Sequence, residues 1–327
     1  MMAPVIRPAS RRTPPPMPVR LGMIGCGRLA ECGYAPAVAR ADGVEIVAVS
    51  DPDRARRGLV AGKLGASAHA STSGLLASGP LHGVVICCTP TEHEAAAEEV
   101  AAAGLRALVE KPPAPDAAGA LRLTALTPAP FTGFNRRFDQ GVELAGRVPA
   151  EGELRLRLVL CYRRASWRPL QRGEDALLDL GPHLVDLALM LTAALPLAVR
   201  AHATRDRAGI ALATSRGTVE IECATNRPYH ELVEIRDARG RRIARSTRGG
   251  HVRGLASRLT PGAHPLVRSL TAQLHAYAGA LRGERPGLLA TAVEGAAAMC
   301  VLDAARRSDA IGGEAIPVEP DCLPQPA

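Results

Sequence analysis

Three polar residues at helical spacing are the first candidates for chemistry. Asp179, His183 and Asp186 stand at positions i, i+4 and i+7, so on a helix they share one face. Imidazole titrates near physiological pH, and a histidine between carboxylates is suited to moving a proton. A helix with a buried, hydrogen-bonded histidine would give the same pattern, as would a metal site, but no second cluster of ligands is evident. From the spacing alone, a proton-transferring histidine and a structural histidine both stay open; we expect no metal.

Lys111 is unusual because only two of the 40 basic residues in this chain are lysines, Lys63 and Lys111. Where arginine is used almost everywhere else, a lysine beside Glu110 indicates that a compact ammonium is required, since a planar guanidinium does not replace it. Pro112 and Pro113 force an extended exit from the preceding strand, which leaves Lys111 at the carboxyl edge of the sheet, where open α/β folds bind ligands. An ordinary surface lysine at a strand end is the alternative.

A glycine-rich turn follows the first apolar run of the chain. Residues 25–30 read GCGRLA, the pattern GxGxxA, between a predicted strand and a predicted helix. The first glycine permits a tight turn, the second lets the backbone approach a pyrophosphate, and the helix N-terminus offers free N–H groups to phosphates. A strand-to-helix turn without a ligand is the alternative. We predict that a dinucleotide is bound by Gly25, Cys26, Gly27, Arg28 and Leu29.

Asp51 ends the second apolar run, 26 residues after Gly25. A carboxylate near this position accepts hydrogen bonds from the adenosine ribose, although a helix-capping aspartate would occupy the same place. Because a carboxylate repels a 2′-phosphate, NAD is the favoured cofactor. Arg54, Arg56 and Arg57 follow closely enough to keep NADP as a second option.

The order of predicted elements explains how these residues are positioned. Apolar runs at 19–25, 44–51, 82–90 and 106–112 alternate with helical patterns, which indicates a parallel sheet covered on both faces. From about residue 150 the pattern changes, because residues 153–164 alternate apolar side chains with arginine, as in an antiparallel strand with one buried face. A helix is predicted near 174–191, further strands between 197 and 236, and two helices near 265–281 and 288–308.

Length and composition narrow the class of protein. The 327 residues leave room for about two domains, and no apolar run reaches the ~18 residues of a membrane helix. The net charge of +8 comes from scattered arginines, and aromatic residues (2%) are too few to stack on single-stranded nucleic acid, so we expect neither a nucleic-acid nor a membrane partner. Eight cysteines without a CxxC pair indicate free thiols and a cytoplasmic location.

Four segments in order give a more specific resemblance. They are CTPTEH at 88–93, VEKPPA at 109–114, GFNRRF at 133–138 and LLDLGPHLVDLALML at 177–191. Together they resemble the Gfo/Idh/MocA family, the group of glucose-fructose oxidoreductase and inositol dehydrogenase, over roughly residues 19–318. The resemblance implies an α/β fold: an N-terminal Rossmann domain and a C-terminal α/β domain on a large, open, mostly antiparallel sheet.

The resemblance also implies domain limits, site residues and an oligomer. We expect a flexible tail at 1–18, the NAD(P)-binding domain at 19–135, a substrate-binding and oligomerisation domain at 136–318 and a tail at 319–327. Lys111, Asp179 and His183 match active-site positions of the family, and its open sheet usually packs in a homodimer or homotetramer. The cofactor would also be contacted by Thr89, Pro90, His93, Glu110 and Lys111, with a helix-capping role as the alternative for His93.

Three further residues are candidates for substrate contacts. Trp167, in the polar stretch RRASWRP, is suited to form an apolar wall for a sugar or cyclitol ring. Arg136 and Arg163 would contact anionic groups of a substrate, or face solvent. The predicted function is hydride transfer between nicotinamide and a secondary alcohol or ketone of a sugar, cyclitol or related polyhydroxylated compound. The alternatives are a cofactor-retaining epimerase or eliminase that works by transient oxidation, and a redox-silent NAD(P)-binding regulator.

Overall fold

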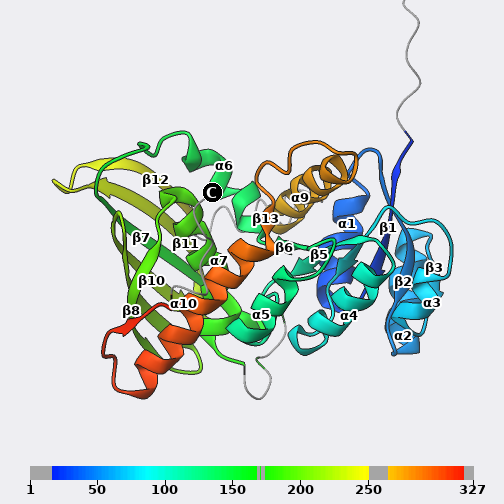
Figure 1. Cartoon of the computed structure of the whole chain (residues 1–327), viewed down its shortest axis with the longest axis horizontal. Helices are drawn as coiled ribbons and strands as arrows, with labels where there is room; N and C mark the ends of the chain where they lie inside the picture. Colours follow the sequence, from blue (N-terminus) through cyan, green and yellow to red (C-terminus); the bar gives the residue numbers. More distant parts are fainter. Residues whose placement is uncertain (1–16, 168–169, 171–173, 250–263, 320–327) are drawn as a thin grey trace, which may run out of the picture.

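The computed structural model describes residues 17–167, 170, 174–249 and 264–319. Apart from residues 17, 18 and 319, the two predicted tails lie outside the described residues. In the described part, the chain forms two sheets of seven strands each, with helix α10 (Ala292–Ala310) running between them (Figure 1). The predicted fold class is confirmed.

The first sheet has the strand order β13-β6-β5-β4-β1-β2-β3 and is parallel except for β13. Its apolar runs form strands because both faces are covered by helices, so the residues are buried without alternation. The strands are β1 (Val19–Ile24), β2 (Val44–Ser50), β3 (Ser67–His69), β4 (Gly83–Ile86), β5 (Arg106–Glu110), β6 (Phe131–Gly133) and β13 (Ala290–Thr291).

Helices pack on both faces of this sheet. One face is covered by the π-helical turn η1 (Ala30–Tyr34), α1 (Ala35–Val38), α2 (Arg54–Leu64) and α9 (Pro265–Leu281). The opposite face is covered by α3 (Thr72–Leu76), α4 (Pro90–Ala102) and α5 (Ala117–Thr124). The predicted helix after the glycine turn is therefore a π turn followed by a short α-helix, and residues after Gly133 form the 3₁₀ turn η2 (Asn135–Phe138) and α6 (Gln140–Ala145).

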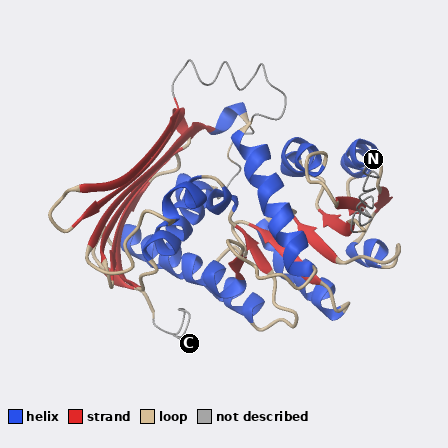
Figure 2. Cartoon of the chain, turned by 90° about the horizontal axis from the view of Figure 1, so that it is seen from above, coloured by secondary structure: helices blue, strands red, loops and turns tan. Residues whose placement is uncertain are grey.

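The second sheet has the order β12-β11-β7-β10-β9-β8-β14 and is antiparallel except for the parallel pair β7–β10. Helices α7 (Ala176–Thr192) and α10 bury one face, whereas Figure 2 shows no helix of the described residues on the other. The strands are β7 (Leu154–Arg163), β8 (Pro196–Ala203), β9 (Arg207–Thr214), β10 (Gly217–Ala224), β11 (Asn226–Asp237), β12 (Arg242–Gly249) and β14 (Ile316–Pro317); the 3₁₀ turn η3 (Arg164–Ser166) follows β7.

The chain returns to the first sheet near its C-terminal end. Helix α9 buries Leu270, Leu274 and Tyr277 in the core of the first sheet, and β13 pairs with β6. The predicted second domain runs without interruption over 136–318. In the structure, α9 lies in that range but packs its apolar face on the first sheet. The boundary near residue 135 stays a prediction.

Candidate active site

The glycine turn has the geometry that a dinucleotide needs. Gly25 has φ +92°, and a Cβ there would lie 2.5 Å from the backbone nitrogen of Cys88, so a side chain would be both strained and blocked. A Cβ on Gly27 would meet no atom within 4 Å, so that side of the turn is open. A tight turn with an open side at a helix start fits a pyrophosphate.

Asp51 lies at the end of β2, where it fixes this turn. One carboxylate oxygen accepts the backbone N–H of Cys26 at 2.9 Å, and the other accepts that of Asp53 at 2.8 Å. Arg56 approaches the second oxygen to 3.4 Å. The oxygen that accepts from Cys26 can accept a second hydrogen bond, so the predicted ribose contact is compatible with these bonds and stays a prediction.

Thr89, Pro90 and His93 belong to the start of α4. Thr89 is the N-cap and forms a capping box with Glu92, and Pro90 is the first helical residue, so the capping role considered for His93 is wrong. His93 is buried, with Nδ1 3.0 Å from the Pro112 carbonyl oxygen and Nε2 3.3 Å from that of Cys88. Burial lowers the pKa of His93 to about 4, which keeps the imidazole neutral and able to donate to one carbonyl only.

Glu110 and Lys111 end β5 and have different surroundings. Glu110 is buried, and its two oxygens accept hydrogen bonds from the Tyr34 hydroxyl at 2.5 Å and from the Lys111 backbone N–H at 3.1 Å. Lys111 Nζ donates to the backbone oxygen of Asp179 at 2.9 Å and lies 3.8 Å from Asp179 Oδ1. Burial lowers the pKa of Lys111, although Asp179 and Glu110 oppose that shift. The predicted cofactor contact of Glu110 stays untested.

Asp179 is held by two residues that the sequence did not single out as its partners. The Tyr162 hydroxyl donates to Asp179 Oδ2 at 2.7 Å, and Arg164 Nε lies 3.3 Å from the same oxygen. Both come from the end of β7 and the turn η3, so the second sheet fixes the carboxylate that faces Lys111. The Asp179 carboxylate therefore lies between two cationic side chains and a hydroxyl, on the side of α7 that faces Lys111.

His183 follows one turn later on α7 and is buried. Burial, then Lys111 and Arg136, lower its pKa well below 6.5. Among the described residues, its Nδ1 has no hydrogen-bond partner. The charged groups that shift its pKa are cations, so the predicted histidine between carboxylates is wrong in that respect.

Asp186 belongs to a different cluster. Arg137 Nε lies 2.9 Å from Asp186 Oδ2 and Arg137 Nη2 lies 2.5 Å from Oδ1, with both side chains almost fully buried. Arg137 Nη2 also pairs with Glu294 at 2.9 Å. This cluster joins η2, α7 and α10, so Asp186 fixes how these three elements pack against one another.

The three substrate candidates lie in three environments. Arg136 is mostly buried and forms an ion pair with the buried Glu231, so an anionic substrate would compete with an internal carboxylate. Arg163 is an exposed residue at the end of β7. The guanidinium of Arg28 stacks 4.9 Å above the ring of Trp167, which brings a residue of the glycine turn into contact with the second domain. The predicted contacts of these residues with substrate stay predictions.

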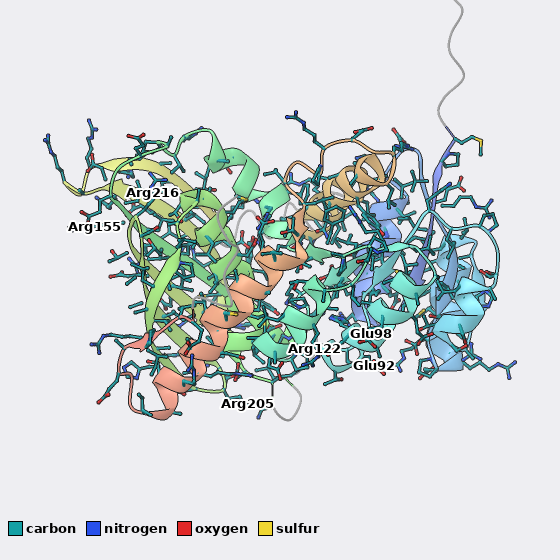
Figure 3. The ribbon with its side chains drawn as sticks, viewed as in Figure 1. Glu92, Glu98, Arg122, Arg155, Arg205 and Arg216 are labelled. Atoms are coloured by element: carbon teal, nitrogen blue, oxygen red, sulfur yellow. The ribbon has the colours of Figure 1, made fainter. Side chains whose placement is uncertain are left out.

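Charged surface residues are distributed over both domains. Figure 3 shows Glu92, Glu98 and Arg122 around α4 and α5, and Arg155 and Arg216 beside the second sheet. Within the described ranges, no three His, Cys, Asp or Glu residues are grouped in a way that could hold a metal ion. No helix among the described residues is long and apolar enough to cross a membrane.

The fold and this site define a two-domain α/β oxidoreductase with a dinucleotide-binding domain, and comparisons with known proteins agree. The sequence profile of the Gfo/Idh/MocA oxidoreductase family, NAD-binding Rossmann fold, matches residues 19–129. Inositol 2-dehydrogenase 1 of Saccharopolyspora erythraea is 30% identical over 233 residues, which are 65% of this chain and 69% of that protein. The chain therefore belongs to the Gfo/Idh/MocA family of NAD-dependent oxidoreductases, and the predictions of family and cofactor are confirmed.

Two further similarities define how far this relation extends. Inositol 2-dehydrogenase 2 of the same organism is 29% identical over 203 residues, and the match spans only 60% of each chain. The crystal structure of myo-inositol dehydrogenase from Lactobacillus casei, in complex with NAD(H) and myo-inositol, superposes with a TM-score of 0.77 at 17% identity and covers 93% of this chain and 97% of that one. The latter similarity shows the fold.

Proposed function

We propose that the protein is an NAD-dependent dehydrogenase, or ketoreductase in the reverse direction, acting on a secondary alcohol of a cyclitol, a sugar or a related polyhydroxylated compound. The observation that carries this proposal is the hydrogen bond of Lys111 Nζ to the backbone of Asp179, one turn before His183. It joins the sheet edge beside the glycine turn to the helix that carries a neutral imidazole. The names of the inositol dehydrogenase relatives support a cyclitol as the first compound to test.

Each residue has one task in this reaction. A nicotinamide cofactor held at the glycine turn would supply the acceptor for the hydride of the carbinol carbon. Lys111 donates a hydrogen bond to the substrate oxygen and stabilises the negative charge that develops there. His183, neutral because of burial and adjacent cations, accepts the hydroxyl proton, so that one hydride and one proton leave the alcohol and a ketone remains. Tyr162 and Arg164 hold Asp179, and Asp179 holds Lys111.

A substrate panel tests the proposal. The purified protein is incubated with NAD and single cyclitols, sugars or nucleotide sugars, and NADH absorbance is followed, with His183→Ala as the matched control. We expect NADH to form with at least one cyclitol or sugar. Product formation without any absorbance change would favour the epimerase or eliminase alternative, and NADH binding without turnover of any compound would favour the regulator.

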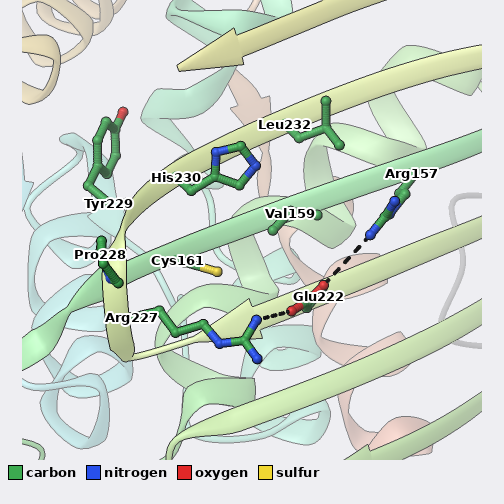
Figure 4. A pocket seen from close by; sticks show the side chains of 9 residues that line it. All are labelled: Arg157, Val159, Cys161, Glu222, Arg227, Pro228, Tyr229, His230 and Leu232. Atoms are coloured by element: carbon green, nitrogen blue, oxygen red, sulfur yellow. Dashed lines mark hydrogen bonds and ion pairs between the residues drawn. The ribbon is translucent and has the colours of Figure 1, made fainter. Parts of the chain in front are cut away.

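We also propose that a second copy of the chain packs on the uncovered face of the second sheet. This face carries a small apolar cluster, formed by Val159, Cys161, Ala224 and Leu232. A shallow pocket of about 440 Å³ lies there. Figure 4 shows its lining, in which Glu222 lies between the guanidinium groups of Arg157 and Arg227. Light scattering is expected to give a dimer or tetramer that Leu232→Lys dissociates; a monomeric wild type would contradict the proposal.

Free thiols support a reducing location. The cysteines of the described ranges are all free, and most of them are buried. Disulfides persist in oxidising compartments and are rare where thiols are kept reduced. We therefore propose that the protein works in the cytoplasm, which fractionation of the source cells would test.

A further inference from the structure

A buried hydrogen-bonded pair connects the first helical segment to Lys111. Tyr34 is fully buried at the end of η1, and its hydroxyl donates to Glu110 Oε1 at 2.5 Å. The other oxygen, Glu110 Oε2, accepts the backbone N–H of Lys111 at 3.1 Å. Both carboxylate oxygens of Glu110 are therefore engaged inside the protein, one by the glycine-turn segment and one by the residue that faces Asp179.

The local backbone favours this pair. The π turn is closed by the bond from the Ala35 N–H to the Ala30 carbonyl oxygen, one residue longer than in an α-helix, and such turns are frequent at functional sites. Tyr34 is its last residue, and Pro36 is the second residue of α1, which begins at Ala35. On the other side, a Cβ on Gly133 would lie only 3.1–3.2 Å from Cα, Cδ and Oε1 of Glu110, so the glycine leaves room for the buried carboxylate.

We propose that Tyr34 and Glu110 are positioning residues for Lys111: Tyr34 fixes the carboxylate of Glu110, and Glu110 fixes the backbone and supports the positive charge of Lys111. A buried carboxylate without donors is costly, so the two hydrogen bonds give it one favoured orientation. Its negative charge lies next to an ammonium that burial would otherwise tend to neutralise. The consequence for catalysis rests on the proposed function, whereas the effect on Lys111 itself does not.

The charges around Lys111 determine whether removal of Glu110 raises or lowers the pKa of Lys111. Asp179 and Glu110 favour the ammonium, whereas Arg164 and Arg136 disfavour it. Burial raises the pKa of Glu110, and the hydrogen bond from Tyr34 and the positive charge of Lys111 counter that rise.

Two other titratable groups near Lys111 and Glu110, His183 and Cys87, are neutral near pH 7. His183 is uncharged near pH 7, because burial and the adjacent cations lower its pKa. Burial raises the pKa of the Cys87 thiol, which also lies near Glu110, well above its usual range. Removing the Glu110 charge is therefore expected to lower the pKa of Lys111.

The small number of lysines makes a direct measurement practical. Selective ¹³C labelling of lysine gives signals from only Lys63 and Lys111, and the Cε shift of each follows its own titration. In Glu110→Gln, the titration midpoint of Lys111 is expected to fall by about one pH unit. The midpoint of Lys63, which pairs with Glu31 on the surface, serves as the internal control. An unchanged Lys111 midpoint in a folded Glu110→Gln protein would overturn the proposal.

Tyr34→Phe separates position from charge. The variant removes the hydroxyl that donates to Glu110 but keeps the carboxylate. The ionisation of Glu110 is expected to appear as a small change in the Lys111 signal at acid pH, and in Tyr34→Phe this change should move to higher pH. The titration midpoint of Lys111 itself should move little. With an active substrate, kcat is expected to fall about tenfold with the KM for NAD unchanged. Tyr277→Phe is the matched control, because Tyr277 is another buried tyrosine of this domain, bonded to the backbone of Val84 and Arg106.

The outcomes separate this proposal from the proposed function. If no compound is oxidised but both variants move the Lys111 or Glu110 titration as described, the positioning holds and the function fails. If wild type is active and Tyr34→Phe changes only thermal stability, as Tyr277→Phe is expected to do, the positioning role is wrong.

Discussion

The lowered pKa of His183 determines how the rate of alcohol oxidation should depend on pH. Alcohol oxidation needs the neutral imidazole, and burial together with Lys111 and Arg136 lowers the pKa of His183 well below 6.5. The base is therefore already neutral at physiological pH. The acid limb of the rate of hydride transfer in the oxidation direction is expected to lie below pH 6.5, whereas an unperturbed histidine would give a limb near 6.5.

Two perturbations test this explanation. His183→Ala removes the base and is expected to slow oxidation by ~10²–10⁴-fold, equivalent to about 3–5 kcal/mol. The double variant Arg136→Met/Glu231→Gln removes one of the two cations that act on His183 together with its buried partner carboxylate, so that no unpaired charge remains. Because a cation disfavours imidazolium, its removal is expected to raise the pKa of His183 and to move the acid limb upward by about one pH unit.

Single-turnover kinetics provide the assay. Enzyme saturated with NAD is mixed with the substrate found in the panel, and NADH formation is recorded from pH 4.5 to 9. Arg155→Met, an exposed arginine on the same domain, is the control and is expected to leave the limb in place. The reasoning is refuted by a wild-type limb at or above pH 6.5, or by a limb that stays in place in the double variant.

Three further outcomes are expected. Lys111→Ala should reduce turnover by ~10²–10⁴-fold and Lys111→Arg should fail to restore it, with NADH affinity unchanged in both by fluorescence titration. Trp167 is the single tryptophan of the chain, so tryptophan fluorescence reports on this residue alone. Arg28→Gln removes the guanidinium that stacks on the Trp167 ring and should change the Trp167 emission and weaken NADH binding. Unchanged emission would contradict the contact. Burial lowers the pKa of His93 in the folded protein to about 4, below its usual 6.5, so its contribution to the free energy of unfolding is complete above pH 6.5 and is lost as the pH falls towards 4. Urea denaturation between pH 6.5 and 4 should show the free energy of unfolding fall by up to about 3 kcal/mol from this residue. The fall should be smaller in His93→Gln.

The sequence predicts those elements whose hydrophobic or glycine pattern lies within a single segment of the chain. The buried runs of β1, β2, β4 and β5 have no polar alternation, and the turn with Gly25 follows one of them directly, so both could be predicted from local rules. The spacing of Asp179 and His183 gave their common helix for the same reason.

The partners of these residues could not be predicted in this way. Periodicity shows which face of an element is apolar but not which distant element covers it. Asp179 is bound by Tyr162 across the second sheet, Asp186 is bound by Arg137, and Trp167 contacts Arg28 of the other domain. Each of these pairings depends on how separate elements dock. The clustering of aromatic residues with arginines near 162–167 was a signal of the site, but it did not identify the carboxylate.

The core of the first sheet is completed by a helix, α9, that is synthesised after most of the second sheet. Tyr277 of α9 accepts a hydrogen bond from the Val84 N–H at 3.0 Å and donates to the Arg106 carbonyl oxygen at 2.6 Å, so it joins two neighbouring strands of the first sheet. A nascent chain that ends before residue 265 therefore exposes the apolar surface that α9 later covers. During synthesis, strands β7 to β12 of the second sheet leave the ribosome before α9 can cover the first sheet. A fragment that ends at residue 135 would lack α9 and would expose the same apolar surface.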